Sequence, residues 1–336
     1  MVASSLPSPT WKRLVSLSLV STLAAGVTSC GGGSRSPTAA TTFDATAALD
    51  EILGILQVQS AYKNKVDWPS VRSSVHALGD GAHSESLLDP AIREAFRLLG
   101  DNHSQYYHPN NGQVVLSPLA QGCISADVGP LSVPANVGYV SVPSTAQVSG
   151  IAYALALQSA IKSSDRPDLV GWIVDVRGNT GGSFYEMLAG VGPVLGDGAA
   201  GQFISADGAT SVVAYTAGVA SIDGIAQMTV TNPYALVRPN PRVAVLINNK
   251  IGSAGEAVVA SFIGRPNTRQ FGISTCGYST GISGFRLSSG ALLNLAVGFM
   301  ADRTGKQYGG GPIPPDETIT DPVLLLARAV AFLNGQ

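Results

Sequence analysis

The chain has 336 residues, of which 45% are hydrophobic and 12% are charged, and its formal net charge is −2. This composition predicts a globular protein with one main domain and an accessory one. Because the charge shows no basic excess, nucleic acid is not expected as a partner. The 39 glycines accompany a high apolar content, which is typical of tight turns rather than of disorder.

Residues 1–29 have the pattern of an export signal. The basic pair Lys12-Arg13 precedes the apolar stretch 14–27, which is too short to predict a membrane-spanning helix. We therefore expect this segment to direct export and not to belong to the fold.

Cys30 follows this signal in a lipoprotein-like context. The segment Val27-Thr28-Ser29-Cys30 resembles the lipobox of bacterial lipoproteins, and residues 30–43 are rich in Gly, Ser, Pro and Thr, as in a flexible tether. We expect a lipid anchor on Cys30 that holds the protein at the cell envelope, facing the periplasm or the surface. The alternative is an ordinary secretory signal with an unrelated cysteine.

Residues 44–108 predict a helical module. Apolar residues at helical spacing indicate helices over 44–62 and from Asp67 onward, and a third helix has Asp89 as its N-cap and Gly100 as its stop. Its core-facing residues are expected to be Leu49, Ile52, Leu53, Leu56, Val71, Val75, Leu78, Ile92, Phe96 and Leu99.

Residues 109–336 predict an α/β core in which strands and helices alternate. The expected strands are 138–142, 169–176, 242–247 and 270–274, followed by a hairpin over 286–297. The expected helices are 146–161, 184–194, 257–263 and 322–332. Two segments depart from this alternation of strands and helices. Residues 201–236 are rich in Thr and Val and predict a β excursion from the main sheet, and residues 277–284 predict a loop.

A glycine-containing turn, 175–182, ends the apolar strand 169–176 and precedes a helix. Glycines let backbone N–H groups point at a ligand, so this turn favours an anion or oxyanion site. A nucleotide phosphate site is the rival interpretation, but the glycine spacing matches neither nucleotide-binding motif.

Ser253 lies in a second strand-turn-helix segment, 248–256, between small residues. A serine at such a turn exposes its hydroxyl beside a helix N-terminus, which is a good place for a nucleophile. The alternative is that Ser253 is only the N-cap of the helix.

His103 comes directly after the helix stop at Gly100, so the preceding helix should hold it firmly. Histidine titrates near neutrality and could serve as a base for a serine nucleophile. The alternative is a histidine in a surface loop.

Four segments in order resemble the tail-specific, or C-terminal-processing, serine peptidases, whose superfamily includes the tricorn core and the interphotoreceptor retinoid-binding repeats. They are 99–104, 175–182, 253–256 and 312–316. The resemblance implies an α/β core of the Clp-protease/crotonase kind, with Ser253 as the nucleophile. It also implies an oxyanion hole from the N–H of Ala254 and that of Gly181 or Gly182.

The chain departs from the processing peptidases at the position of the catalytic base. Tyr278 stands where those enzymes have lysine, whereas His103 falls at the histidine of the tricorn branch. A carboxylate should orient the imidazole, but the tricorn-type glutamate would fall near Gly309, where there is none. Asp302 is the first candidate for this role and Glu256 the second.

A peptide-binding PDZ domain is not expected. Only about thirty residues separate His103 from the strand that begins near Val137, against about ninety for such a domain.

The resulting expectation is an exported serine peptidase that acts on peptide or protein substrates without a cofactor or a metal. Two alternatives remain: a non-catalytic protein that binds peptides or apolar ligands on the same scaffold, and an esterase.

Cys123 and Cys276 are the cysteines that remain after Cys30. In an exported protein an even pair suggests a disulfide, and here it would fix the loop around Tyr278 beside the groove. Two buried thiols are the alternative.

Overall fold

The computed structural model describes residues 43–336 except 110, 124–128, 130 and 146–148. The expected signal, Cys30 and the tether up to residue 42 lie outside the described residues. None of the described helices is long and apolar enough to cross a membrane.

Three helices open the described chain, as predicted. They are α1 (Ala45–Gln59), α2 (Trp68–Gly79) and α3 (Asp89–Leu99), with 3-10 turns at Lys63–Lys65 and Glu85–Leu88. Asp44 and Asp67 cap α1 and α2 by accepting backbone N–H groups. Gly100 ends α3 in a left-handed conformation, with φ at 72°.

Two details of these helices differ from the prediction. Asp89 is the first residue of α3 rather than its N-cap, and its carboxylate pairs with Nε2 of His108 at 2.8 Å. Leu78 is 51% exposed, because Gly79 faces the core in its place. A Cβ on Gly79 would lie 2.7 Å from Cδ1 of Leu49, so the two helices approach closely there.

An eight-stranded antiparallel sheet runs from the helices into the core. Its order is β2-β1-β12-β5-β6-β7-β8, and β11 pairs with β12 beside this path. The strands are β1 (Gln105–Tyr107), β2 (Val114–Leu116), β5 (Gly198–Ile204), β6 (Thr210–Thr216), β7 (Val219–Ile222), β8 (Ile225–Thr229), β11 (Thr280–Arg286) and β12 (Leu292–Ala301). The loop expected over 277–284 is therefore a strand from Thr280 onward, because it pairs with the long strand β12.

A five-stranded parallel sheet has the order β13-β10-β9-β4-β3. Its strands are β3 (Val137–Ser141), β4 (Gly171–Asp175), β9 (Val243–Ile247), β10 (Thr268–Gly272) and β13 (Glu317–Thr318). Every residue of β4 and β9 is buried, as expected of strands covered on both faces.

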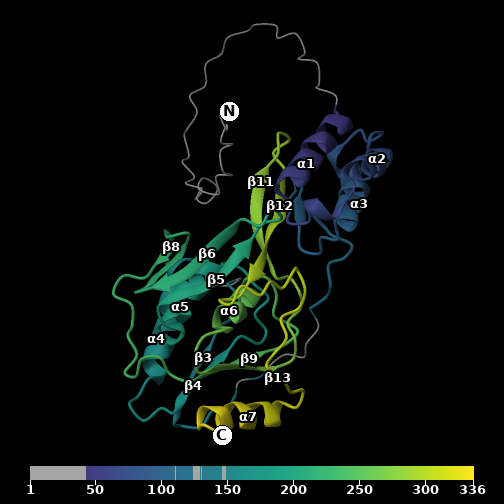
Figure 1. The fold of residues 1–336 in the computed structure, drawn as a ribbon. Helices are drawn as coiled ribbons and strands as arrows, with labels where there is room; N and C mark the ends of the chain where they lie inside the picture. The colour runs from purple at the N-terminus through teal and green to yellow at the C-terminus, as the bar shows by residue number, and fades with distance from the viewer. Residues whose placement is uncertain (1–42, 110, 124–128, 130, 146–148) are drawn as a thin grey trace, which may run out of the picture.

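Helices cover both faces of the parallel sheet (Figure 1). One face packs with α4 (Ile151–Ser164), α5 (Phe184–Leu195) and α6 (Ala254–Phe262), and the other with α7 (Pro322–Leu333). The helix expected from residue 146 is shorter: α4 begins at Ile151, after Gly150 with φ at 69°. The fold is thus α/β with N-terminal helices, as predicted.

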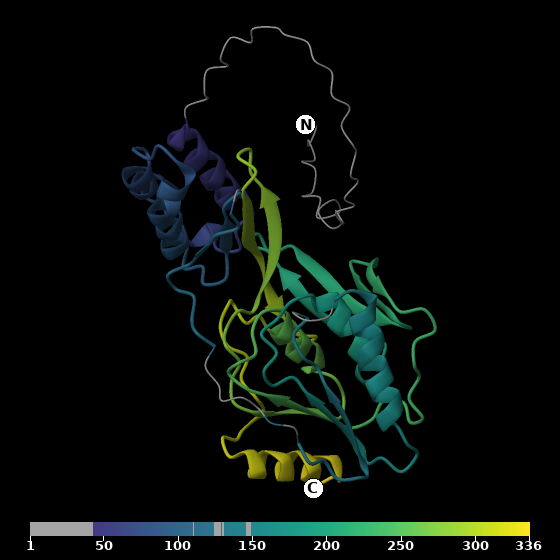
Figure 2. The same cartoon turned by 180° about the vertical axis from the view of Figure 1, so that it is seen from behind.

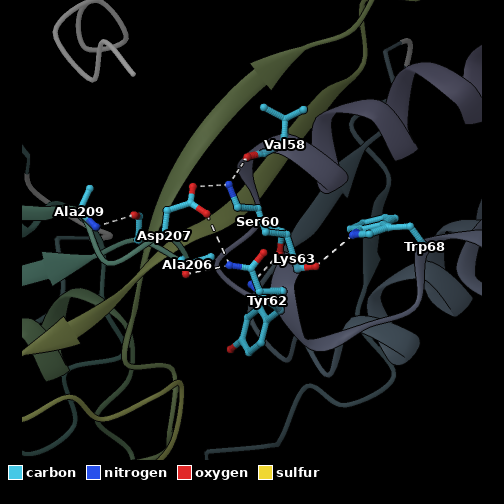
Figure 3. A network of polar contacts seen from close by, with 10 residues as sticks. Val58, Ser60, Tyr62, Lys63, Trp68, Ala206, Asp207 and Ala209 are labelled. Carbon is cyan, nitrogen blue, oxygen red and sulfur yellow. Dashed lines mark hydrogen bonds and ion pairs between the residues drawn. The ribbon is translucent and has the colours of Figure 1, made fainter. Parts of the chain in front are cut away.

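The N-terminal helices lie at one end of the molecule, near the β11–β12 hairpin, and α7 lies at the other end (Figures 1 and 2). Figure 3 shows a polar contact that joins these helices to the core: Nζ of Lys63 lies 2.5 Å from Asp207, in the β5–β6 turn. Because β1 also pairs with β12, the two parts share one sheet, and the division at residue 108 stays a prediction.

Candidate active site

Ser253 occupies the turn between β9 and α6, where it is the N-cap residue of α6. Its backbone has φ 52° and ψ −119°, whereas N-cap residues usually lie in the β region. A non-glycine residue at positive φ costs on the order of 1–3 kcal/mol, and such residues cluster at functional sites. The cap interpretation is thus correct for position, but the conformation is that of a sharp nucleophile turn.

The glycine turn packs directly against Ser253. Gly252 donates its N–H to the carbonyl oxygen of Asn179 at 3.0 Å. A Cβ on Gly181 would lie 3.0 Å from Cβ of Ser253, so only glycine permits this approach. The two strand-turn-helix segments found in the sequence therefore meet at one point.

The glycine turn and the Ser253 turn both provide backbone N–H groups. These N–H groups differ in whether they already donate a hydrogen bond. Gly181 donates its N–H to Oδ1 of Asn179 at 2.9 Å and is thereby occupied. Within the described part of the chain, the N–H groups of Gly182 and Ala254 take part in no hydrogen bond. Of the two glycines left open by the sequence, Gly182 is consequently the available donor.

Gly182 is held in a conformation that excludes a side chain. Its φ is 123°, and a Cβ there would lie 2.0 Å from Oγ1 of Thr145. The same Thr145 oxygen accepts the N–H of Ser183 at 2.8 Å, which fixes the start of α5 beside the turn.

His103 is fixed by its own backbone. Asp101 is buried, and its Oδ1 accepts the N–H groups of His103 and Ser104 at 2.9 and 3.0 Å. Asn102 donates from Nδ2 to the carbonyl of Gly277 at 2.9 Å, which ties this turn to the loop before β11. Asp101 therefore supports the histidine through the backbone and not through the ring.

The His103 ring contacts Thr280 and Tyr278. Nδ1 lies 2.7 Å from Oγ1 of Thr280, and the ring centroid lies 5.1 Å from that of Tyr278. Burial lowers the pKa of His103 from 6.5 to about 4, so the ring is neutral at pH 7. In the described part of the chain, Nε2 has no hydrogen-bond partner.

His103 and Ser253 line the same cavity, whose volume is about 460 Å³. No hydrogen bond joins them within the described residues. Catalytic hydrogen bonds are often long in the absence of substrate and tighten in its presence.

Neither predicted carboxylate bonds to the His103 ring. Asp302 accepts from Thr304 at 2.8 and 2.6 Å and from the hydroxyl of Tyr308 at 2.7 Å, so it organises its own turn. Its expected orienting role at the histidine is therefore not supported, because its acceptor positions are filled locally. Thr280 has that place instead.

Glu256, the second candidate, joins the serine turn to the neighbouring loop. Its Oε2 accepts the N–H of Ser253 at 3.0 Å, and its Oε1 accepts from Thr275 Oγ1 at 2.5 Å and from the N–H of Gly277 at 2.8 Å. Burial raises the pKa of Glu256 to about 7. It is a supporting group for the turn and does not contact the ring.

The loop before β11 is fastened by a disulfide between Cys123 and Cys276. Cys276 donates its N–H to the carbonyl of Ile251 at 2.8 Å, and the hydroxyl of Tyr278 donates to the carbonyl of Gln121 at 2.6 Å. Tyr278, which we expected at the lysine position of the processing peptidases, thus lines the His103 cavity and is anchored there by this hydrogen bond.

Thr280 is the site residue that the sequence did not indicate. No local motif marks it, and only the pairing of β11 with β12 places it beside the histidine.

No group of three or more His, Cys, Asp or Glu in the described residues is placed to hold a metal.

Serine hydrolase sites combine three features that meet here. They are a strained serine between a strand and a helix, free backbone donors beside it, and a neutral histidine on the same cavity. The model of peptidase family S41 matches residues 136–319, which is more than half of the chain. The chain belongs to peptidase family S41, a family of serine peptidases.

Known proteins agree with this assignment. A relative is the nisin-resistance protein of Lactococcus lactis subsp. lactis, 26% identical over 260 residues that cover 76% of this chain and 77% of the relative.

Solved structures share the fold at low identity. A lipoprotein from Streptococcus agalactiae matches with a TM-score of 0.67 and 21% identity, over 89% of this chain and 99% of that one. The photosystem II D1 C-terminal processing protease matches with a TM-score of 0.57 and 13% identity, over 86% and 96%. The predicted Clp-protease-like core and the resemblance to the processing peptidases are confirmed.

Proposed function

We propose that the protein is an exported endopeptidase in which Ser253 is the nucleophile and His103 the base. The observation that carries this proposal is the meeting of the strained Ser253 turn with the free N–H groups of Gly182 and Ala254, on the cavity that His103 lines. Membership of a serine peptidase family supports the reaction class.

The first step forms an acyl-enzyme. Nε2 of His103 accepts the hydroxyl proton while Oγ of Ser253 attacks the peptide carbonyl carbon. The carbonyl oxygen becomes an oxyanion that accepts from the N–H groups of Ala254 and Gly182, each typically worth about 3–4 kcal/mol. The imidazolium then gives its proton to the leaving amine, the C–N bond breaks, and water hydrolyses the ester by the reverse path.

The orienting group in this proposal is a hydroxyl. In the tautomer that this proposal requires, Nδ1 of His103 donates its proton to Oγ1 of Thr280, 2.7 Å away, and Nε2 is left basic. A hydroxyl stabilises the imidazolium less than a carboxylate does, so a modest turnover is expected.

A serine-directed phosphonate tests the chemistry. The mature protein should be labelled at Ser253, as shown by mass spectrometry, and Ser253→Ala should not. Turnover of unstructured peptides should vanish in Ser253→Ala and His103→Ala alike. The name of the relative from Lactococcus lactis makes nisin one substrate to include.

A non-catalytic binding protein is the second candidate function. It is favoured by Tyr278 at the lysine position and by the lack of a described carboxylate at the His103 ring. Peptide binding without phosphonate labelling of wild type would identify it. Turnover of esters with no turnover of peptides would identify an esterase instead.

The proposed location is the cell envelope, through a lipid on Cys30. The similarity to a streptococcal lipoprotein and the disulfide both support export. Cell fractionation tests it: wild type should be found with membranes and Cys30→Ala in the soluble envelope fraction. Equal membrane retention of both proteins contradicts the anchor.

A further inference from the structure

Two cavities meet at Ser253. The first has a volume of about 420 Å³ and the second about 460 Å³, both within the usual range of ligand pockets. Among the described residues, three line both of them: Gly182, Ser253 and Ile282. Gly182 and Ser253 belong to the proposed reaction centre, whereas Ile282 has no role assigned so far.

The first cavity is mainly apolar. Aromatic and aliphatic side chains form its walls, among them Phe184, Phe203, Ile222, Val297 and Met300. Of the described residues that line it, Asp223 is the single charged one. Such a cavity favours an apolar side chain and disfavours an acidic one, which would lose its hydration and meet a like charge.

The second cavity is more polar than the first and contains His103, the base of the proposed reaction. His103 lines it together with side-chain amides and hydroxyl groups, including Asn102, Gln105, Thr180 and Asn294. In the proposed reaction His103 gives its proton to the leaving amine, so the leaving side of the substrate must lie here. The acyl side then extends into the apolar cavity, which Ala254 of the oxyanion site also lines.

Ile282 owes its position to an irregularity in β11. Gly281 pairs with Gly298 of β12, but Ile282 pairs with Ala296, so the register shifts between Gly281 and Ile282. Bulges next to active sites re-aim side chains. Ile282 is left 36% exposed between the cavities, and its branching at Cβ restricts it to few rotamers.

We propose that Ile282 is the specificity-determining residue of this site. It separates the groove into an apolar acyl-side cavity and a polar leaving-side cavity. The enzyme therefore cleaves after a large apolar residue and before a small or polar one. This inference rests on the proposed function.

Quenched fluorescent peptides test it when one residue is varied at a time and mass spectrometry identifies the bond cleaved. For wild type we expect kcat/KM to be about tenfold or more higher for Leu or Phe than for Asp before the bond. After the bond, Ser should exceed Leu by about tenfold. Ile282→Ala should reduce this second ratio to about threefold or less, whereas Ile282→Val should keep it.

A second variant examines the apolar cavity. In Met300→Trp the indole should fill the apolar cavity. The variant should therefore lower kcat/KM for peptides with Phe before the bond about tenfold or more, relative to its kcat/KM for peptides with Ala at that position. Leu324→Ala, on α7 and 50% exposed, is the matched control and should leave the profile unchanged. If Ile282→Ala does not fold, Ile282→Ser replaces it with the same expected ratio.

The outcomes separate this inference from the proposed function. If wild type cleaves peptides and is labelled at Ser253 but discriminates less than about threefold at both positions, the inference is wrong and the proposed function stands. The same holds if Ile282→Ala keeps the wild-type preference. Absence of both labelling and cleavage in wild type overturns the proposed function and this inference with it.

Discussion

Nδ1 of His103 lies 2.7 Å from Oγ1 of Thr280, so a hydroxyl stands where the histidine of a Ser-His-Asp triad meets a carboxylate. Thr280 is the first residue of β11, and its place is set by the pairing of Thr280 with Phe299 of β12. The orientation of the base thus depends on sheet register and not on a residue close to it in sequence.

Thr280→Val should remove this orientation while it keeps the shape of the side chain. A hydrogen bond of this kind contributes about 1–1.5 kcal/mol, so kcat should fall about tenfold with little change in KM. Steady-state kinetics on one peptide measures this. Thr280→Ser, which keeps the hydroxyl, should retain most of the activity; equal losses in both variants would point to packing rather than orientation.

Gly182→Ala should disable the oxyanion site. The added Cβ would lie 2.0 Å from Oγ1 of Thr145 at a φ of 123°, so the turn must move and carry its N–H away. Loss of one such donor lowers kcat about 10²–10³-fold. Gly208→Ala is the matched control: its φ is 79°, but no atom lies within 4 Å, so it should cost stability and spare kcat. Full activity of Gly182→Ala would remove Gly182 from the mechanism.

His103 and Glu256 should make opposite contributions to stability as pH changes. Burial lowers the pKa of His103 from 6.5 to about 4, so its contribution is present above pH 6.5 and is lost as pH falls through 4. Burial raises the pKa of Glu256 from 4.5 to about 7, so its contribution is present below pH 4.5 and is lost as pH rises through 7. Each amounts to about 3 kcal/mol.

The pH dependences of the two contributions nearly cancel in wild type between pH 4.5 and 6.5, and single variants should reveal them. The free energy of unfolding of Glu256→Gln should rise with pH across this window, and that of His103→Gln should fall. Urea unfolding at several pH values measures both slopes. Parallel slopes in the two variants would contradict the assignment.

The low pKa of His103 also predicts that kcat/KM stays high down to about pH 5 and falls near pH 4.

Much of the site could be predicted because its parts are local. Ser253 and Gly182 each lie in a strand-turn-helix segment that is visible in the sequence, and the stop at Gly100 marks the turn that carries His103. Parallel strands end at one edge of their sheet, so two such turns on neighbouring strands β4 and β9 must meet.

The rest depended on contacts that sequence spacing does not report. Asp302 was the nearest acidic residue in its loop, but its oxygens are taken by Thr304 and Tyr308, a competition that becomes visible only in the fold. Glu256 was placed on the right helix, but its partners Thr275 and Gly277 lie in a different loop. Thr280 needed the strand that begins there, where the glycines and serines of the sequence indicated a loop.

The disulfide between Cys123 and Cys276 should stabilise both the fold and the site. The two cysteines are 153 residues apart, and closing a loop of this length stabilises a protein by about 2–5 kcal/mol. The double variant Cys123→Ser/Cys276→Ser should unfold at lower urea concentration. It should also lose activity, because the anchor of Tyr278 beside His103 is loosened.

Thiol titration of the denatured, unreduced wild type should find no reactive thiol from this pair. Treatment with a thiol reductant should bring wild type to the level of the double variant and leave that variant unchanged. Two reactive thiols in the untreated protein would show that the bridge does not form in solution.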